Sequence, residues 1–423
     1  MAKTSRIHPA DLVGYSRLAV SATVGLTSVV EAMHRNITGP PNNDGDARPV
    51  RTNGITGAVY SSVRGVTTLV GGGIDAILAR AVTTSRPTGS SPEREALLAA
   101  LNGVIGDYMA ETNNPLAISM SLRRNGKTLN LSRQALAAAI PEASRKLVLL
   151  VHGLGMNDLQ WTRQGHDHGE ALARDLEYTP VYLYYNSGLH ISTNGRALAE
   201  LLEALVEQWP VPLQQFVMIG HSMGGLLLRA AYHYGTLANY CWTRKLRKLI
   251  FLGTPHHGSP LERGGNLLEF VLQLNRYSSP LAGLGKVRSA GVTDLRYGNL
   301  LDEDWHSRDR FRVAGDLRRP VPLPRKVKCY AIAASTSERP GSISSIVLGD
   351  GLVPVGSALG LHGDPKRTLH FAKSRQWVGY GMRHLDLLSH PAVYEVIKKW
   401  VASPPRECPK RQSKPIPATF SVV

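Results

Sequence analysis

Short apolar runs and amphipathic helical patterns alternate along most of the chain after residue 116. The apolar runs at 146–151, 216–219 and 248–252 lack the polar alternation of a half-solvated strand, which is typical of parallel strands covered on both faces. The other expected strands lie at 181–185, 327–333 and 376–379, and the expected helices at 167–176, 195–208 and 391–401. We therefore predict an α/β fold with a mostly parallel sheet flanked by helices.

Three segments depart from this alternation of strands and helices within or next to the expected main domain, residues 116–402. The Asn125-Gly126 pair, which lies between two strand-like segments, predicts a β-hairpin near its start. Residues 256–326 are rich in Gly and Arg, and an insertion of this length between two strands is expected to cover a pocket as a cap. The tail at 403–423 is rich in Pro, Lys and Arg, which predicts disorder.

The first 115 residues form a separate helical extension in this prediction. Apolar residues recur at steps of three and four over 9–35 and 59–77, which indicates a helical hairpin, and a third helix is expected over 91–110. The charge-free runs at 18–30 and 65–74 are shorter than the roughly 20 residues that span a bilayer. The hairpin is therefore expected either to pack on the main domain or to bind a membrane or granule surface.

The charge and the cysteine content of the chain indicate which partners and which cell compartment to expect. The chain has 423 residues, of which 43% are hydrophobic, and a formal net charge of +17. This charge favours anionic surfaces, but no sequence-specific nucleic-acid motif accompanies it. Three scattered cysteines and the lack of an apolar leader segment predict a protein of the cytoplasm, with peripheral association to an anionic membrane or a lipid or polyester granule as an alternative.

A G-x-S-x-G pentapeptide follows the apolar run at 216–219 and precedes a helical pattern. In Gly220-His221-Ser222-Met223-Gly224 the serine therefore falls on a sharp turn between a strand and a helix. A tight turn of this kind presents a serine hydroxyl at a helix N-terminus. We predict Ser222 as a catalytic nucleophile.

A serine nucleophile needs a base and a carboxylate, expected in the chain order Ser, acid, His. His384 lies just after the last expected strand, where a loop can bring an imidazole over Ser222, and is the predicted base. Asp350 stands between two glycines that let its carboxylate turn inward, and is the predicted acid. Asp364 is the alternative acid, and His370 and His390 are the alternative bases.

Several other titratable residues are assigned structural roles at this stage. Asp294, Asp302 and Asp304 fall within the expected cap, Asp386 is too close in sequence to His384, and His256 and His257 are expected in a pocket wall. The His166-Asp167-His168 triplet lacks further metal ligands, so we interpret it as a solvated loop.

The developing oxyanion needs two N–H donors. One is expected from Met223, the residue after the nucleophile, and the other from Leu154 in the Gly-rich loop that follows the strand at 146–151.

The motifs taken together resemble one superfamily. Val-His-Gly-Leu-Gly at 151–155, Gly-His-Ser-Met-Gly-Gly at 220–225, Gly-Thr-Pro-His-His-Gly at 253–258 and Gly-Asp-Gly-Leu-Val-Pro at 349–354 are similar to motifs of the α/β-hydrolases, in particular the bacterial lipases and esterases of the GPI-inositol-deacylase-like branch. The resemblance covers about residues 116–402. It implies the same triad of Ser222, Asp350 and His384 and the same donors, Leu154 and Met223.

We therefore expect a serine hydrolase of carboxylic esters that acts on an apolar ester or acyl substrate through an acyl-enzyme and needs neither metal nor cofactor. Acyl transfer or thioester hydrolysis on the same triad is an alternative. A further alternative is a membrane- or granule-associated protein in which the N-terminal hairpin is the binding element.

Overall fold

A computed structural model gives the structure of residues 11, 13–24, 61, 90–259, 288–306, 308, 315–338 and 349–403. The expected hairpin helices at 25–35 and 59–77, residues 260–287 of the expected cap and the tail after residue 403 lie outside these residues, apart from Ser61.

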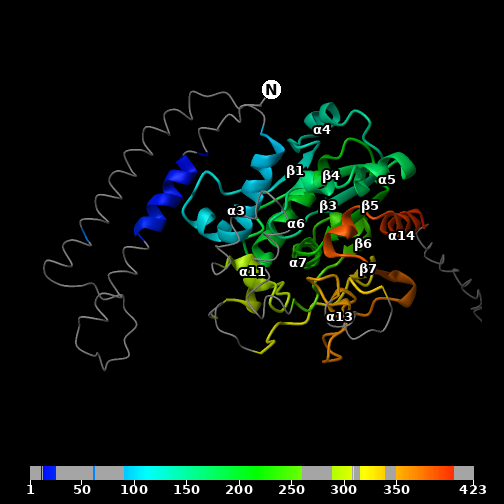
Figure 1. Ribbon diagram of the computed structural model, residues 1–423. Coiled ribbons are helices and arrows are strands. Elements are labelled where there is room, and N and C mark those ends of the chain that lie inside the picture. The colour runs from blue at the N-terminus through cyan, green and yellow to red at the C-terminus, as the bar shows by residue number, and fades with distance from the viewer. Residues whose placement is uncertain are drawn as a thin grey trace, which may run out of the picture.

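One eight-stranded sheet forms the centre of the molecule (Figure 1). Its strands are β1 Ser121–Arg124, β2 Lys127–Thr128, β3 Lys146–Val151, β4 Thr179–Tyr184, β5 Gln215–His221, β6 Leu246–Leu252, β7 Lys328–Ser335 and β8 Gln376–Tyr380. Their order across the sheet is β2-β1-β4-β3-β5-β6-β7-β8. All neighbouring pairs from β4 to β8 in this order are parallel, and among the described strands only the β1–β2 and β1–β4 pairs are antiparallel. The predicted α/β fold with a mostly parallel sheet is confirmed.

Helices lie on both faces of this sheet (Figure 1). The α-helices are α3 Pro92–Glu111, α4 Arg133–Ala139, α5 His168–Leu176, α6 Ile191–Gln208, α7 Met223–Leu237, α8 Trp242–Lys245, α11 Ala290–Asp294, α13 Val355–Ala358 and α14 Pro391–Ala402. Short 3-10 turns occupy η1 Asp158–Trp161, η3 Asp302–Asp304, η4 Lys373–Arg375 and η5 His384–Leu388.

Alternate residues of the central strands enter two separate apolar cores. Leu147 and Leu149 of β3 join the core under α6 and α7, whereas Val148 and Leu150 join the core under α5 and α14. All four side chains are 0% exposed. A strand buried on both faces must be apolar at every position, and this explains the continuous apolar runs in the sequence.

The β1–β2 hairpin turns where the sequence predicted it. Asn125 and Gly126 have φ values of 52° and 71°, and two successive positive φ angles are the signature of a type I′ turn. Arg123 of this hairpin pairs with Glu95 of α3 and Asp158 of η1 at 3.0 and 3.2 Å. This ion-pair group joins the hairpin to both elements.

The described start of the N-terminal extension contacts α3 and the segment after it. Residues 13–24 are helical, and Arg94 of α3 donates two hydrogen bonds to the Asp11 carboxylate at 2.5 and 2.6 Å. Asn114 donates to the Gly14 carbonyl at 3.1 Å. None of the described helices is both long enough and apolar enough to cross a bilayer. The boundaries of the extension and the function of its hairpin stay predictions.

The described part of the expected cap packs on the main domain near the end of β5. Ser289 Oγ donates to the Gly103 carbonyl of α3 at 2.7 Å, and a Cβ at Gly291 of α11 would lie 3.1 Å from Met223 Cε. Asp294 accepts from the Ile191 N–H at 2.8 Å and so caps α6. Asp304 accepts from the N–H groups of Leu300 and Leu301.

Close packing of α7 on β3 generates a stability prediction. A Cβ at Gly224 would lie 2.3 and 2.5 Å from the carbonyl oxygens of Val151 and His152, which are backbone atoms that cannot rotate away. We expect Gly224→Ala to lower the free energy of unfolding by about 1–3 kcal/mol, although alanine is the better helix former. Urea denaturation measures this change.

Gly363→Ala is the matched control, because a Cβ at Gly363 meets nothing within 4 Å. Equal unfolding midpoints for the two variants would contradict the assigned contact.

Candidate active site

Ser222 occupies a strained turn between β5 and α7. Its φ of 54° lies in the left-handed region, which costs a non-glycine residue on the order of 1–3 kcal/mol. The Ser222 N–H donates to the Leu252 carbonyl of β6 at 2.8 Å, and a Cβ at Gly220 would lie 2.7 Å from Gly225 Cα. The glycines therefore let the helix approach the strand, and the turn presents the half-buried serine at the N-terminus of α7.

Asp350 and His384 form a buried hydrogen-bonded pair. His384 Nδ1 donates to Asp350 Oδ2 at 2.7 Å, and the two residues are 4% and 2% exposed respectively. The other carboxylate oxygen of Asp350 accepts from the N–H groups of Leu352 and Val353 at 2.9 and 2.8 Å. These bonds fix the carboxylate and the tautomer of the imidazole.

The second ring nitrogen of His384 is left as an acceptor. His384 Nε2 is buried and has no hydrogen-bond partner among the described residues. A Cβ at Gly253, the residue after β6, would lie 3.1 Å from both Asp350 Oδ2 and His384 Cε1. The pair therefore lies at the C-terminal ends of the strands, beside the turn that carries Ser222.

Two buried histidines hold the loop that carries His384. His221 Nε2 donates to the His384 carbonyl at 3.2 Å, and His168 Nε2 donates to the Leu387 carbonyl at 2.9 Å. His166 Nε2 donates in turn to His168 Nδ1 at 2.8 Å. Burial lowers the pKa of His168 to about 4 and that of His221 well below its ordinary value, so both rings are neutral near pH 7.

The interpretation of residues 166–168 as a solvated loop is wrong for His168. That residue is 0% exposed and begins α5, while Asp167 caps this helix by accepting from Gly169 N–H at 2.7 Å. An Asp immediately before a helical pattern is an N-cap signal that the sequence already contained. The contact with Leu387 joins residues 219 positions apart and had no local signal.

The loop after β3 brings further backbone donors to the turn. A Cβ at Gly153 would lie 3.0 Å from Ser222 Cβ, so the loop passes directly against the serine. Tyr185 Oη donates to the His152 carbonyl at 2.9 Å, and the Gly155 N–H donates to Ser187 Oγ at 2.9 Å. These bonds fix the loop on both sides of Leu154.

The N–H groups of Leu154 and Met223 have no acceptor within the part of the chain that the structure covers. Both belong to buried residues, and Met223 is the first residue of α7. Helix N-terminal N–H groups without an internal acceptor stabilise negative charge. The two donors named from the sequence are therefore free to bind an anion.

The alternative candidates lie in other environments. Asp364 accepts from the Lys366 N–H at 2.9 Å, and Asp386 accepts from the Arg383 N–H at 2.8 Å. His390 caps α14 by accepting from Ala392 N–H, and His370 is exposed. None of these residues bonds to His384 or Asp350 in the described contacts.

His256 and His257 both line a cavity beside α7 whose described lining includes neither Ser222 nor His384, so their expected place in the wall of the substrate pocket stays a prediction. Across the described ranges, no group of three or more His, Cys, Asp or Glu side chains is arranged to hold a metal ion.

Comparison with known proteins places the region around Ser222 in a family. Residues 142–318 match the family model described as the PGAP1-like alpha/beta domain. For the matched residues, which are less than half of the chain, this bears out the predicted resemblance to that branch of the α/β-hydrolase superfamily. No curated protein sequence matches the chain.

Solved bacterial structures resemble the chain at low sequence identity. The mature lipase BlEst2 of Bacillus licheniformis is 18% identical over 60% of this chain and 91% of its own, with a TM-score of 0.40. Lipase 1 of Pelosinus fermentans is 12% identical over 60% and 97%, with a TM-score of 0.35. The Staphylococcus hyicus lipase is 13% identical over 61% and 95%, with a TM-score of 0.36.

The buried histidine His168 predicts a loss of stability in acid. Its folded-state pKa of about 4 lies below the ordinary value of 6.5, so the unfolded chain binds more protons between these values. The stabilisation is complete above pH 6.5 and falls by up to about 3 kcal/mol as the pH decreases to 4. Urea unfolding at pH 7, 6, 5 and 4 measures this slope.

We expect His168→Gln to reduce the slope by the share of His168, because the amide can donate to Leu387 but does not titrate, while buried His221 still contributes. His370→Gln, at an exposed histidine, is the control and should leave the slope unchanged. A wild-type slope in His168→Gln would exclude this residue as the cause.

Proposed function

Residues 142–318 form a PGAP1-like α/β domain, and we propose that the protein is a serine hydrolase of carboxylic esters with Ser222, Asp350 and His384 as its triad. The observation that carries the proposal is the buried Asp350–His384 hydrogen bond, which leaves His384 Nε2 unpartnered beside the strained serine turn. That arrangement is what a general base for a serine nucleophile requires.

The chemistry follows from the roles of these atoms. His384 Nε2 accepts the proton of Ser222 Oγ as the oxygen attacks the ester carbonyl carbon. The N–H groups of Leu154 and Met223 bind the resulting oxyanion. Collapse expels the alcohol, which takes the proton from His384, and leaves an acyl-enzyme that water hydrolyses by the same sequence of steps.

Asp350 supports this cycle through charge and orientation. Its carboxylate stabilises the imidazolium that forms when His384 is protonated, and its bonds from Leu352 and Val353 keep it aligned with Nδ1. His168 and His221 position the His384 loop through its carbonyl groups. No metal and no cofactor is needed for any of these steps.

We expect Ser222→Ala and His384→Ala each to lower kcat on p-nitrophenyl esters by about 10⁴-fold or more, with the fold retained by circular dichroism. A series of acyl chains from acetate to palmitate identifies the preferred substrate. His370→Gln is the control for the histidine variant. Near-normal turnover in either alanine variant would reject the triad.

Asp350→Asn is expected to lower kcat by about 10³–10⁴-fold, because the amide favours the wrong tautomer of His384. Asp364→Asn, at the alternative acid, should keep wild-type activity. A large loss of kcat in Asp364→Asn together with wild-type activity in Asp350→Asn would instead identify Asp364 as the acid.

Covalent labelling tests the nucleophile independently of substrate choice. A fluorophosphonate probe should modify the wild-type protein once, at Ser222, and should leave the Ser222→Ala protein unlabelled by intact mass spectrometry. Labelling of the alanine variant would place the reactive serine elsewhere.

The proposal also includes the molecule that accepts the acyl group and the location of the enzyme in the cell. Product analysis with a competing alcohol distinguishes hydrolysis from acyl transfer, and thioester substrates test the thioesterase alternative. An apolar ester substrate, a cytoplasmic location and association with anionic membranes or granules stay predictions. Sedimentation with liposomes of proteins with and without residues 1–110 tests the contribution of the N-terminal hairpin.

A further inference from the structure

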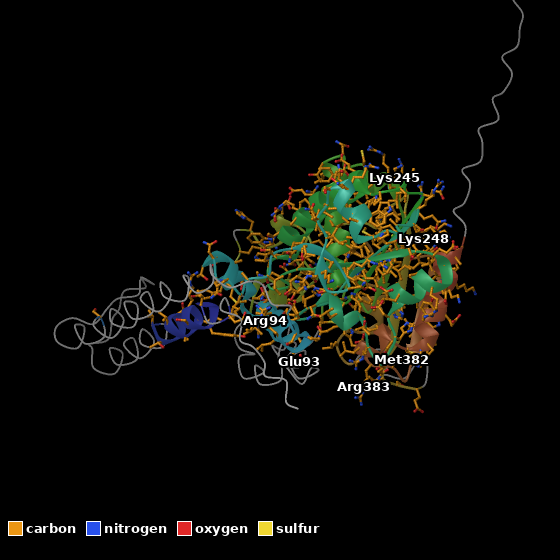
Figure 2. All side chains as sticks on the ribbon, turned by 90° about the horizontal axis from the view of Figure 1, so that it is seen from above. Glu93, Arg94, Lys245, Lys248, Met382 and Arg383 are labelled. Atoms are coloured by element: carbon orange, nitrogen blue, oxygen red, sulfur yellow. The ribbon has the colours of Figure 1, made fainter. Side chains whose placement is uncertain are left out.

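A second cavity lies at the opposite end of the sheet from Ser222. It has a volume of about 740 Å³ and is bounded by the second half of α7, by α8, by the start of β6 and by residues 321–326. Because β5 and β6 are parallel, Arg247 at the start of β6 and Ser222 after the end of β5 mark opposite edges of the sheet. Figure 2 shows the corresponding separation between Lys245 and Met382, which is close in sequence to His384.

Cationic side chains surround this cavity without matching carboxylates. Its lining includes four exposed cations, at Arg244, Arg247, Arg325 and Lys326, and contains no Asp or Glu. None of the four forms an ion pair in the described residues, and the hydrogen bonds of Arg244 and Arg247 go to Cys241 Sγ and to a backbone carbonyl. Like charges gathered without counter-charges repel one another, and a bound anion would relieve this repulsion.

Arg229 adds a buried charge to the same cavity. The residue is 5% exposed, and its guanidinium reaches the Val321 carbonyl at 2.6 Å and His256 Nδ1 at 3.3 Å. Its Nε is buried and has no acceptor, and no described carboxylate pairs with it. Burial and the nearby Arg318 lower its pKa to about 9. This uncompensated charge adds to the positive potential of the cavity, which an anion bound there would offset.

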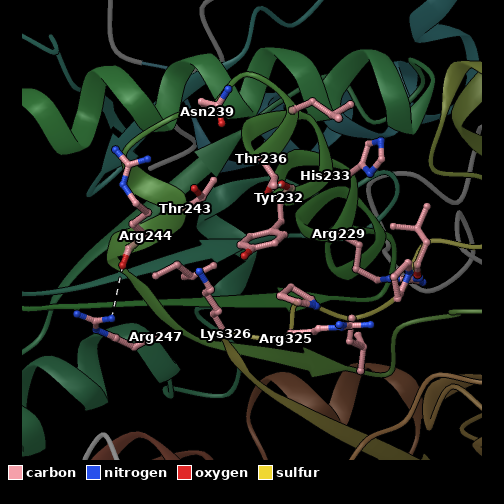
Figure 3. Close-up of a pocket in the computed structure, with 16 residues that line it drawn as sticks. Arg229, Tyr232, His233, Thr236, Asn239, Thr243, Arg244, Arg247, Arg325 and Lys326 are labelled. Atoms are coloured by element: carbon pink, nitrogen blue, oxygen red, sulfur yellow. Dashed lines mark hydrogen bonds between the residues drawn. The ribbon is translucent and has the colours of Figure 1, made fainter. Parts of the chain in front are cut away.

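The remainder of the lining is mostly apolar. Figure 3 shows Tyr232 in the middle of the cavity, with Arg244 and Arg247 on one side and Arg229 on the other. Leu237, a large apolar residue that is 66% exposed, contributes to the wall at the end of α7. An apolar cavity of this size with convergent polar groups is typical of small-molecule sites.

We propose that this cavity binds a phosphate ester that carries an apolar group. The phosphate would lie among Arg244, Arg247 and Lys326, and the apolar group against Tyr232 and Leu237. A phosphate monoester carries about −1.5 to −2 charges near pH 7 and accepts bidentate arginine bonds, so it matches several cations better than a single carboxylate does. The site is separate from the Ser222 turn and does not depend on the proposed hydrolysis.

Isothermal titration with octyl phosphate below its micellar concentration tests the site on the full-length protein. We expect one saturable site whose affinity falls with rising salt. Octanoate and methyl phosphate should each bind at least tenfold more weakly, because one lacks the second charge and the other lacks the apolar group. Octyl glucoside, which has no charge, should not bind.

Variants at the rim locate the ligand. Arg247→Gln combined with Lys326→Gln should weaken octyl phosphate at least tenfold, whereas Arg174→Gln, at an exposed arginine of α5, should leave the affinity unchanged. Leu237→Ser should weaken octyl phosphate and leave methyl phosphate unaffected. Rim residues are used because replacing Arg229 would also remove its contacts with Val321 and His256.

The outcomes separate this proposal from the one for Ser222. Ser222→Ala should bind octyl phosphate like the wild type even though it lacks esterase activity. The proposal is wrong if no saturable binding occurs, if the Arg247 and Lys326 double variant binds normally, or if octyl glucoside binds as well as octyl phosphate. Equal binding of octanoate would overturn the assignment of phosphate as the charged group.

Discussion

The close contact between the first turn of α7 and the sheet is the constraint on which the rest of the site depends. Gly224 lies against the carbonyl groups of Val151 and His152, where no side chain fits. The chain must therefore leave β5 and enter α7 through one sharp turn at Ser222. A looser turn would change the positions of the Ser222 hydroxyl and the Met223 N–H relative to the loop after β3.

Parallel strands explain why distant segments meet at this turn. The carboxyl ends of β3, β5, β6 and β7 reach the same edge of the sheet, and the segments that follow them carry Leu154, Ser222, Gly253 and Asp350. The loop with His384 follows β8 and is held by neutral histidines from β5 and α5. Keeping those histidines uncharged is a condition for a stable site, because a charged imidazole in the apolar interior would be strongly unfavourable.

The two ends of the sheet have opposite electrostatic characters. At the carboxyl ends, backbone N–H groups and one buried carboxylate surround the serine turn. At the amino ends, basic residues precede and begin β6 and β7, and the cavity beside them has no described acidic lining. The exposed cations of this cavity therefore lie far from the proposed triad, where the proposed anionic ligand would contact them.

Patterns within the sequence were sufficient to predict the fold class and to name the candidate triad. Apolar runs buried on both faces placed β3 and the other parallel strands within a few residues, and the Asn125-Gly126 pair and the serine pentapeptide are local signals whose geometry follows from the residues themselves. The order of motifs singled out Ser222, Asp350 and His384. Three other features became evident only in the folded chain: Asp350 rather than Asp364 contacts His384, His168 supports the His384 loop, and Arg229 lies buried beside a basic cavity. These contacts join segments that are far apart in the chain. They could not be predicted, because burial and pairing of side chains over such distances leave no periodic or local pattern in the sequence.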